Sequence, residues 1–234
     1  MKTKINFWPK ADLNGLNQIG KTFYLAEKEN ASRVLTGIDY LDSLLYGGLR
    51  RGSLTVLAGR PGSGVESIPH RIALHVASQA NQTVCLFNTN QDSSVSAHLM
   101  FRNLAGANYY GCEWAVDQEE MNKLLNAKTF MDTLPVYVAS KAGINIRWLE
   151  KSLQQAWQHE DLKPDLIIVD SIQGLDEIDR SEDGFYTVMR KLKELALGYN
   201  AAVIVTSDLK RNLEKRKNKR PYDLTPFVVP LLSE

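Results

Sequence analysis

The sequence lacks the features that identify several common classes of protein. It has 2 cysteines, Cys85 and Cys112, among 234 residues, and no His, Cys, Asp or Glu cluster has metal-ligand spacing, which excludes a disulfide scaffold or zinc module. No apolar run approaches the roughly 18–20 residues that a membrane-spanning helix needs, and the N-terminus does not resemble a signal peptide. The net charge is only +1, so any electrostatic attraction to a partner must be local. These absences predict a cytoplasmic globular protein without a bound metal ion.

Short apolar runs alternate with amphipathic stretches along the chain. Nearly continuous hydrophobic runs predict strands that are buried on both faces, as in a parallel sheet covered by helices. The five expected strands are residues 53–58, 83–87, 135–139, 166–170 and 201–206. The expected helices are residues 69–80, 94–104, 147–159 and 184–197, the last with Phe185, Val188, Leu192 and Leu195 on one face. This alternation predicts a doubly wound α/β domain.

The stretch GRPGSGVES, residues 59–67, follows the first expected strand and precedes the first expected helix. A phosphate-binding loop has the pattern GxxxxGK[ST] in this position, with a lysine for the β- and γ-phosphates and a hydroxyl for magnesium. Gly59 and Gly64 match its glycines, but Val65 stands at the lysine position and Glu66 at the hydroxyl position. Both chemical groups are therefore missing. The candidate residues of this vestigial nucleotide site are Gly59, Arg60, Pro61, Gly62, Ser63, Gly64, Val65, Glu66 and Ser67.

Pro69 conflicts with a helix that begins at Val65, because proline in the fifth position removes a backbone hydrogen bond and clashes with the preceding turn. We therefore predict that the helix begins later, with Ser67 or Ile68 as its cap and Pro69 in its first turn. Glu66 then lies at the helix N-terminus, where a carboxylate is stabilised. In that arrangement the glutamate itself occupies the anion site.

The exchange of a lysine for a glutamate is expected to weaken polyphosphate binding strongly. A pair of unit charges 4 Å apart is worth ~4 kcal/mol at an effective dielectric constant of ~20. The loss therefore corresponds to a decrease in affinity on the order of a thousandfold. The alternative is a rescued site, in which Ser67 supplies the magnesium hydroxyl and Arg60 or Arg71 replaces the lysine. ATP and Mg²⁺ are expected as cofactors only under that alternative.

Three segments taken together resemble the ATPase domain of the bacterial replicative hexameric helicases, the DnaB family within the RecA-like fold. They are TGIDYLDSLLYGGLRRGSLTVLAGRP (residues 36–61), LIIVDSIQGL (166–175) and RKLKELALGYNAAVIVTSDLKRNLEKRKNKRP (190–221). The motif DSIQ is also similar to the RecA-related repair ATPases. The resemblance implies a RecA-like, mainly parallel sheet flanked by helices. It further implies that Asp170 is the aspartate that holds magnesium through water, and that Gln173 couples nucleotide state to the DNA-contacting loops.

Several positions depart from the family pattern. The family's catalytic glutamate follows the second strand, where this chain has FNTNQDSS, residues 87–94. Asp92 is the nearest acid there, and the amide of Gln91 cannot serve as a general base. Asp208 stands where the resemblance implies a sensor glutamine, and we expect no counterpart in this sequence of the family's later strand, whose basic residues reach a neighbour's γ-phosphate. The loop lysine, the loop hydroxyl, the catalytic glutamate and the basic residues of the later strand are all unmatched. We therefore expect that the chain does not hydrolyse ATP, and we assign no catalytic residue.

The segment 210–220 contains seven basic residues and one acid. Clustered Lys and Arg side chains bind nucleic-acid phosphates, and the resemblance implies that this segment faces single-stranded DNA. The alternative is a solvated loop, which is the usual setting of a run of charges. The candidate DNA-binding residues are Lys210, Arg211, Lys215, Arg216, Lys217, Lys219 and Arg220.

The sequence predicts an N-terminal arm or linker over residues 1–35, a RecA-like helicase-type domain over 36–224 and a tail over 225–234. The expected function is that of a degenerate, non-hydrolysing DnaB-like protein in DNA replication or recombination. Such a protein would bind a replicative helicase, a sister RecA-like subunit or single-stranded DNA, and homo-oligomers are compatible with it. One alternative is a divergent but active ATP-dependent DNA helicase that forms a hexamer. Another is an architectural module that binds DNA through residues 210–220 alone.

Overall fold

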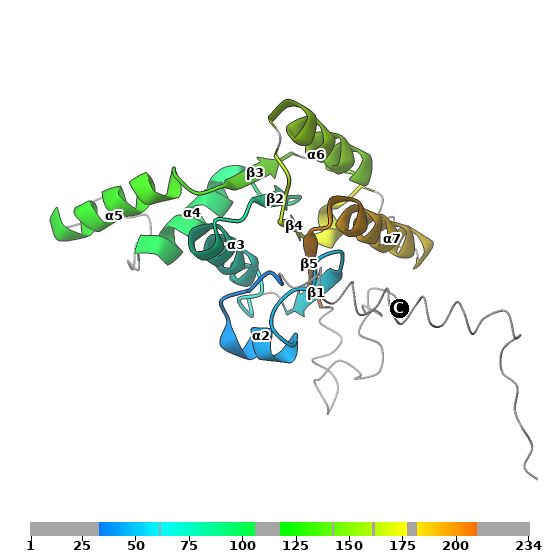
Figure 1. Ribbon diagram of the computed structural model, residues 1–234, viewed down its shortest axis with the longest axis horizontal. Helices are drawn as coiled ribbons and strands as arrows, with labels where there is room; N and C mark the ends of the chain where they lie inside the picture. Colours follow the sequence, from blue (N-terminus) through cyan, green and yellow to red (C-terminus); the bar gives the residue numbers. More distant parts are fainter. Residues whose placement is uncertain are drawn as a thin grey trace, which may run out of the picture. The chain divides into compact units, whose positions relative to one another are not determined.

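The computed structural model describes residues 33–60, 62–105, 118–141, 143–160, 162–176 and 182–209. Five parallel strands form one sheet in the order β1-β5-β4-β2-β3 (Figure 1). All five expected strands are confirmed, each within 2 residues of its expected bounds. The strands are β1 (Leu54–Gly59), β2 (Val84–Asn88), β3 (Val136–Ser140), β4 (Leu166–Asp170) and β5 (Ala202–Asp208).

Helices cover both faces of the sheet, as the doubly wound prediction requires. One face packs against α6 (Ile146–Glu160) and α7 (Glu182–Tyr199), and the other packs mainly against α3 (Ser67–Ala80) and α4 (Ser93–Ala105). The expected apolar face of α7 is buried in the first of these layers.

Strand β4 shows why an inner strand is apolar at every position. Ile167 and Val169 pack on the α6 and α7 side, whereas Leu166 and Ile168 pack on the α3 and α4 side. All four side chains are 0% exposed. Successive residues of a strand point to opposite faces, so a sheet with two helical layers needs apolar residues at both sets of positions.

The prediction of two-sided burial is wrong for β1 and β3. These are the edge strands of the described sheet, and their side chains are only partly buried. Ala58 is exposed, and Tyr137 is 47% exposed. An apolar run predicts a strand, but it does not distinguish an edge position from a central one.

Two helices were not predicted, α2 (Asp39–Leu44) and α5 (Gln118–Met131). Helix α2 has only 6 residues, none of them is buried, and of its apolar residues only Leu41 packs against the core. Among the side chains of α5 that the structure describes, only Leu124 and Ala127 are buried, while Met121, Leu125 and Phe130 are exposed. Neither segment therefore shows the strong 3.6-residue periodicity on which sequence prediction depends.

Asp42 organises the short segment around α2. Its carboxylate accepts hydrogen bonds from the Thr36 amide (2.8 Å), the Thr36 hydroxyl (2.8 Å) and the Gly37 amide (3.1 Å). Gly37 has a φ of +72°, and a Cβ on it would lie 2.3 Å from the His75 ring. Residues 36–42, TGIDYLD, are thus held together by the Asp42 carboxylate. Position 37 requires glycine because its φ is positive and because the His75 ring leaves no space for a side chain.

Among the helices that the structure describes, none is long and apolar enough to cross a membrane. The expected arm and tail lie outside the described residues, apart from residues 33–35. The boundaries of the three expected parts therefore stay a prediction.

Cys85 lies within β2 and is 4% exposed, as its apolar surroundings predict. Burial raises the pKa of its thiol to about 12, so at pH 8 the folded state holds the protonated, unreactive form. In a C112A variant, we expect a thiol reagent such as DTNB to label the native protein a thousandfold or more slowly than the denatured protein, because exposure of this core strand requires global unfolding at a cost of about 5 kcal/mol or more. Rapid labelling of native protein, at one thiol per chain, would contradict a buried Cys85.

Candidate functional site

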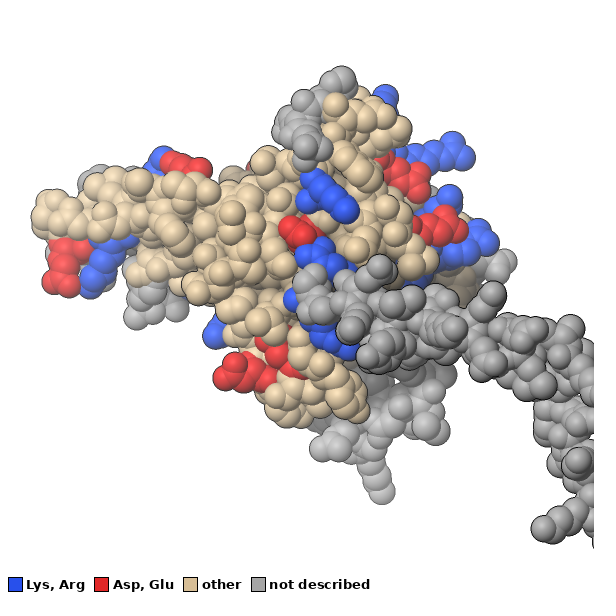
Figure 2. Space-filling view, in the orientation of Figure 1, with Lys and Arg blue, Asp and Glu red and all other residues tan. Residues whose placement is uncertain are grey.

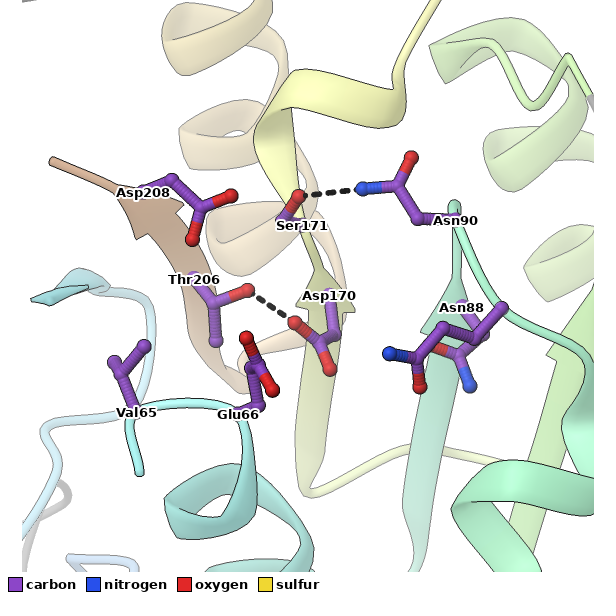
Figure 3. A pocket seen from close by; sticks show the side chains of 9 residues that line it. Val65, Glu66, Asn88, Asn90, Asp170, Ser171, Thr206 and Asp208 are labelled. Atoms are coloured by element: carbon purple, nitrogen blue, oxygen red, sulfur yellow. Dashed lines mark hydrogen bonds between the residues drawn. The ribbon is translucent and has the colours of Figure 1, made fainter. Parts of the chain in front are cut away.

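A cavity of about 180 Å³ lies at the carboxyl ends of β2, β4 and β5, beside the start of α3 (Figure 3). Ligands of open parallel α/β sheets bind at this end of the strands. The sheet register pairs Asn88 with Asp170, and the Thr206 hydroxyl donates a hydrogen bond to Asp170 Oδ1. Three neighbouring strands thus contribute one row of polar side chains. The lining residues are Val65, Glu66, Asn88, Asn90, Gln91, Asp170, Ser171, Thr206 and Asp208.

Val65 closes the glycine loop against the end of β1. Its side chain is 6% exposed, and a Cβ on Gly59 would lie only 2.7 Å from the Val65 Cβ. The valine therefore covers Gly59, at the position where the phosphate-loop pattern has a lysine that extends to the phosphates. Pro61, another candidate residue of this loop, lies outside the described residues.

The rest of the loop uses two of its backbone amides internally. The Ser63 amide donates to the Arg60 carbonyl and the Ser67 amide donates to the Gly64 carbonyl, both at 2.9 Å. Gly62 and Gly64 have φ values of +77° and +85°, which confirms that the loop needs glycine's backbone freedom. These two amides are engaged within the chain rather than available to an anion.

Helix α3 begins at Ser67 with Glu66 as its N-cap, so the predicted cap at Ser67 or Ile68 is wrong by one or two residues. Pro69 lies in the first turn, as predicted, because residue i−4 from it is Val65, which precedes the helix. The Glu66 side chain makes no capping hydrogen bond and points into the cavity (Figure 3). The carboxylate therefore lies in the cavity instead of capping the helix.

The cavity is acidic. Three carboxylates line it, from Glu66, Asp170 and Asp208, and no Lys or Arg among the described residues does so. Asp170 is 8% exposed, and its burial raises the pKa of the carboxyl; the charge of Asp208 adds to that increase, whereas the hydrogen bond from Thr206 opposes it. The described lining does not supply the positive charge that a triphosphate requires, so these residues do not fit that group.

A buried hydrogen-bond chain fixes the orientation of Asn88. His70 Nδ1 lies 2.8 Å from the Glu66 carbonyl oxygen, and because a carbonyl only accepts, Nδ1 donates this hydrogen bond. His70 Nε2 lies 2.8 Å from the Ser96 hydroxyl oxygen, and that oxygen accepts a hydrogen bond from Asn88 Nδ2. The Asn88 side chain, in a residue 1% exposed, thereby keeps Oδ1 without any hydrogen-bond partner.

Asp92, the acid nearest to the expected catalytic position, caps a helix and does not line the cavity. Its carboxylate accepts a hydrogen bond from the Ser94 amide at 2.8 Å, at the start of α4. This hydrogen bond lowers the pKa of Asp92, which makes the group a weaker base. Its position in the structure is therefore accounted for by helix capping.

Gln173 lies in the 3₁₀ helix η1 (Ile172–Gly174), outside the cavity lining. Its Nε2 donates to the Ser207 hydroxyl at 2.9 Å and to the Asp208 carbonyl at 3.3 Å. The amide thus joins the end of β4 to the end of β5.

The structure brings together only part of the predicted nucleotide site. Val65, Glu66 and Asp170 line the cavity, whereas Ser67, Arg60 and Arg71, the residues of the rescued alternative, do not. Sequence reasoning missed the roles of Asn88, Ser171 and Thr206. The available signal was a polar residue at the end of an apolar run, as in CLFN, IIVDS and VIVTS.

The seven predicted DNA-binding residues, Lys210 to Arg220, all lie outside the described residues. On the face drawn in Figure 2, the acidic and basic side chains of the described residues are interspersed. Binding of nucleic acid by residues 210–220 therefore stays a prediction from the sequence.

The parallel sheet, its two helical layers and the glycine loop after β1 define a RecA-like α/β domain. The fold is similar to that of a solved ATPase domain, with a TM-score of 0.74 and 20% identity over 94% of this chain and 78% of that chain. It is also similar to a DnaB-like replicative helicase whose structure was solved to study its interactions with primase, with a TM-score of 0.76 and 20% identity over 90% of this chain and 52% of that one.

The family model for the DnaB-like helicase C terminal domain matches residues 33–224, so this chain belongs to that family. It is 28% identical to the replicative DNA helicase DnaB of Synechocystis over 84% of this chain, and 25% identical to the replicative DNA helicase DnaC of Bacillus subtilis over 83%. The chain spans 23% and 43% of those two proteins, respectively. It is also 25% identical to the DNA repair protein RAD51 homolog 4 of Bos taurus over 90% of this chain and 63% of that protein. This agrees with the similarity of the DSIQ motif to RecA-related repair ATPases.

Proposed function

We propose that this chain acts in DNA replication as a RecA-like subunit of the DnaB family that does not hydrolyse ATP. It works by binding a replicative helicase, a sister subunit or DNA. The observation that carries this proposal is the carboxylate of Glu66, which points into the cavity beside Asp170 where the family pattern predicts a nucleotide-binding site.

The charge balance of the cavity supports the loss of the nucleotide. A triphosphate would meet three carboxylates and no described Lys or Arg. Each pair of like charges about 4 Å apart costs ~4 kcal/mol at an effective dielectric constant of ~20, and solvent screening at the exposed Glu66 reduces that cost. Several kcal/mol of lost binding energy is enough to bring a micromolar site to millimolar affinity or weaker, since each ~1.4 kcal/mol is a factor of ten.

The role in replication and the partner are supported by the relatives. Several are named as replicative DNA helicases, and residues 33–224 of this chain match the family model of the DnaB-like helicase C terminal domain. A domain that keeps the RecA-like fold without the nucleotide could use its inherited subunit-packing surface to cap, load or inhibit a ring. Size-exclusion chromatography with light scattering, on the chain alone and mixed with a bacterial replicative helicase, would identify this partner.

Thermal unfolding of the full chain with ATP and Mg²⁺ tests the proposed loss of nucleotide binding. We expect no shift of the melting temperature at millimolar ATP, whereas a binder at about 100 times its dissociation constant would gain ~2.7 kcal/mol of stability. The replicative helicase of Geobacillus stearothermophilus, a relative 25% identical over 80% of this chain, serves as the positive control. Stabilisation by ATP together with phosphate release would favour the alternative of an active, divergent helicase.

A further inference from the structure

We propose that the chain's own basic segment, residues 210–220, occupies the acidic cavity through one of its lysine or arginine side chains. This inference rests on the proposed function, because the cavity is open to the segment only if no triphosphate binds there. The segment follows β5, whose last residue, Asp208, lines the cavity. The segment itself lies outside the described residues.

The cavity has negative charge that the described residues do not balance. Its three carboxylates come from Glu66, Asp170 and Asp208, and neither Glu66 nor Asp208 forms an ion pair with a described Lys, Arg or His side chain. Carboxylates that share a site repel one another, and a cation among them removes that repulsion. The segment 210–220 carries seven basic residues and one acid, so it has the complementary charge.

Asn88 provides an independent indication of a missing hydrogen-bond donor. It lines the same cavity and is only 1% exposed. Its Nδ2 donates to the Ser96 hydroxyl oxygen, whereas its Oδ1 has no hydrogen-bond partner among the described residues. A buried acceptor without a donor is costly, so a group that brings N–H donors into the cavity is stabilised there.

The arrangement suits a basic side chain better than a metal ion. Within the part of the chain that the structure describes, no three His, Cys, Asp or Glu side chains are placed to hold a metal ion. Ammonium and guanidinium groups carry only N–H donors, three in lysine and five in arginine. Such a group donates to carboxylate and amide oxygens that are too far apart to share one metal ion.

The short connection favours this segment over a free ligand. Only six residues separate Asp208, on the cavity wall, from Lys215, and seven residues of extended chain span at most about 25 Å. A tether of this length gives the bound group an effective concentration on the order of millimolar. The same cations are the predicted DNA-binding residues, so their contact with the cavity withholds them from nucleic-acid phosphates and acts as an autoinhibitory contact.

Limited proteolysis of the full chain by trypsin tests this contact, with the cleavage after Lys215, Arg216 and Lys217 followed by mass spectrometry. We expect cleavage there to be at least fivefold faster in E66Q and in D208N than in the wild type, because each variant removes one cavity charge and keeps the size of the side chain. D132N is the matched control and should leave the rate unchanged, since Asp132 pairs with Lys128 and does not line the cavity. Cleavage after Lys193, within α7, reports global unfolding and should not change in any variant.

A zero-length carbodiimide cross-linker gives a second measurement on the wild-type chain, which does not depend on the folding of a variant. We expect cross-links within one chain from Glu66 to Lys215, Lys217 or Lys219. Equal cleavage rates in the wild type, E66Q and D208N, or absence of these cross-links, would overturn the contact. Protection that increases with protein concentration would also overturn it, because the segment of a second copy would then occupy the cavity.

The same measurements with millimolar ATP and Mg²⁺ separate this inference from the proposed function. Protection that is unchanged by ATP supports both. Protection that ATP abolishes would support the contact in the nucleotide-free chain and overturn the proposed loss of nucleotide binding. Absence of protection with and without ATP would overturn the contact and leave the proposed function intact.

Discussion

The double variant V65K/E66T is expected to bind ATP and Mg²⁺ with an affinity on the order of a thousandfold above that of the wild-type chain. The substitutions restore the lysine and the hydroxyl of the phosphate-loop pattern and change the local charge by two units. A single charge pair in this setting is worth ~4 kcal/mol, so a gain of this size is physically reasonable. Isothermal titration calorimetry with ATP and Mg²⁺ measures the affinity of each form.

The single variant E66T is the matched control for this gain. It removes the carboxylate without supplying the lysine, so we expect an intermediate affinity. The double variant should still fail to hydrolyse ATP, because no general base was restored after β2 and Asp92 caps α4. Failure of the double variant to bind ATP would show that the loop conformation, and not its charge, blocks the nucleotide.

Ile168→Ala is expected to lower the free energy of unfolding by about 2–5 kcal/mol. Ile168 is 0% exposed in β4, a central strand, and belongs to the core on the α3 and α4 side. Truncation removes apolar contacts and leaves a cavity that the surrounding strands cannot easily fill, since both neighbours of β4 are themselves buried strands. Urea denaturation followed by circular dichroism measures the change.

Leu197→Ala is the control for this core substitution. Leu197 is an apolar residue of α7 but is 62% exposed, so its truncation should change the stability by no more than about 0.5 kcal/mol. Equal effects at the two positions would contradict the assignment of β4 to the centre of the sheet.

The inner strands were predictable because helices cover both faces of the sheet, so that the side chains on both faces of an inner strand must be apolar. Every residue of β4 from Leu166 to Val169 must be apolar, and the sequence shows this directly. The difference between inner and edge strands was not predictable, since Tyr137 in β3 looks like any other aromatic residue of a strand. Helix α5 was missed because much of its apolar surface, including Leu125 and Phe130, is exposed.

Residues of the candidate site were predictable only where a short stretch of sequence contains a recognisable motif. The pair Val65 and Glu66 could be identified from the spacing of the loop, and Asp170 from the family resemblance. The role of Asn88 could not, because its orientation depends on Ser96 and His70, which are brought together by the packing of α3 against α4. A hydrogen-bond chain across three elements has no signature in a local stretch of sequence.

Val65 packs over Gly59 and fills the space beside the end of β1. Under the proposed function, no adenine nucleotide binds the folded chain, so nucleotides add nothing to its stability. Abundance and conformation of the chain would then stay constant when the energy charge of the cell falls. Under the proposed function, starvation, which lowers the ATP concentration, would leave the chain able to bind a partner helicase.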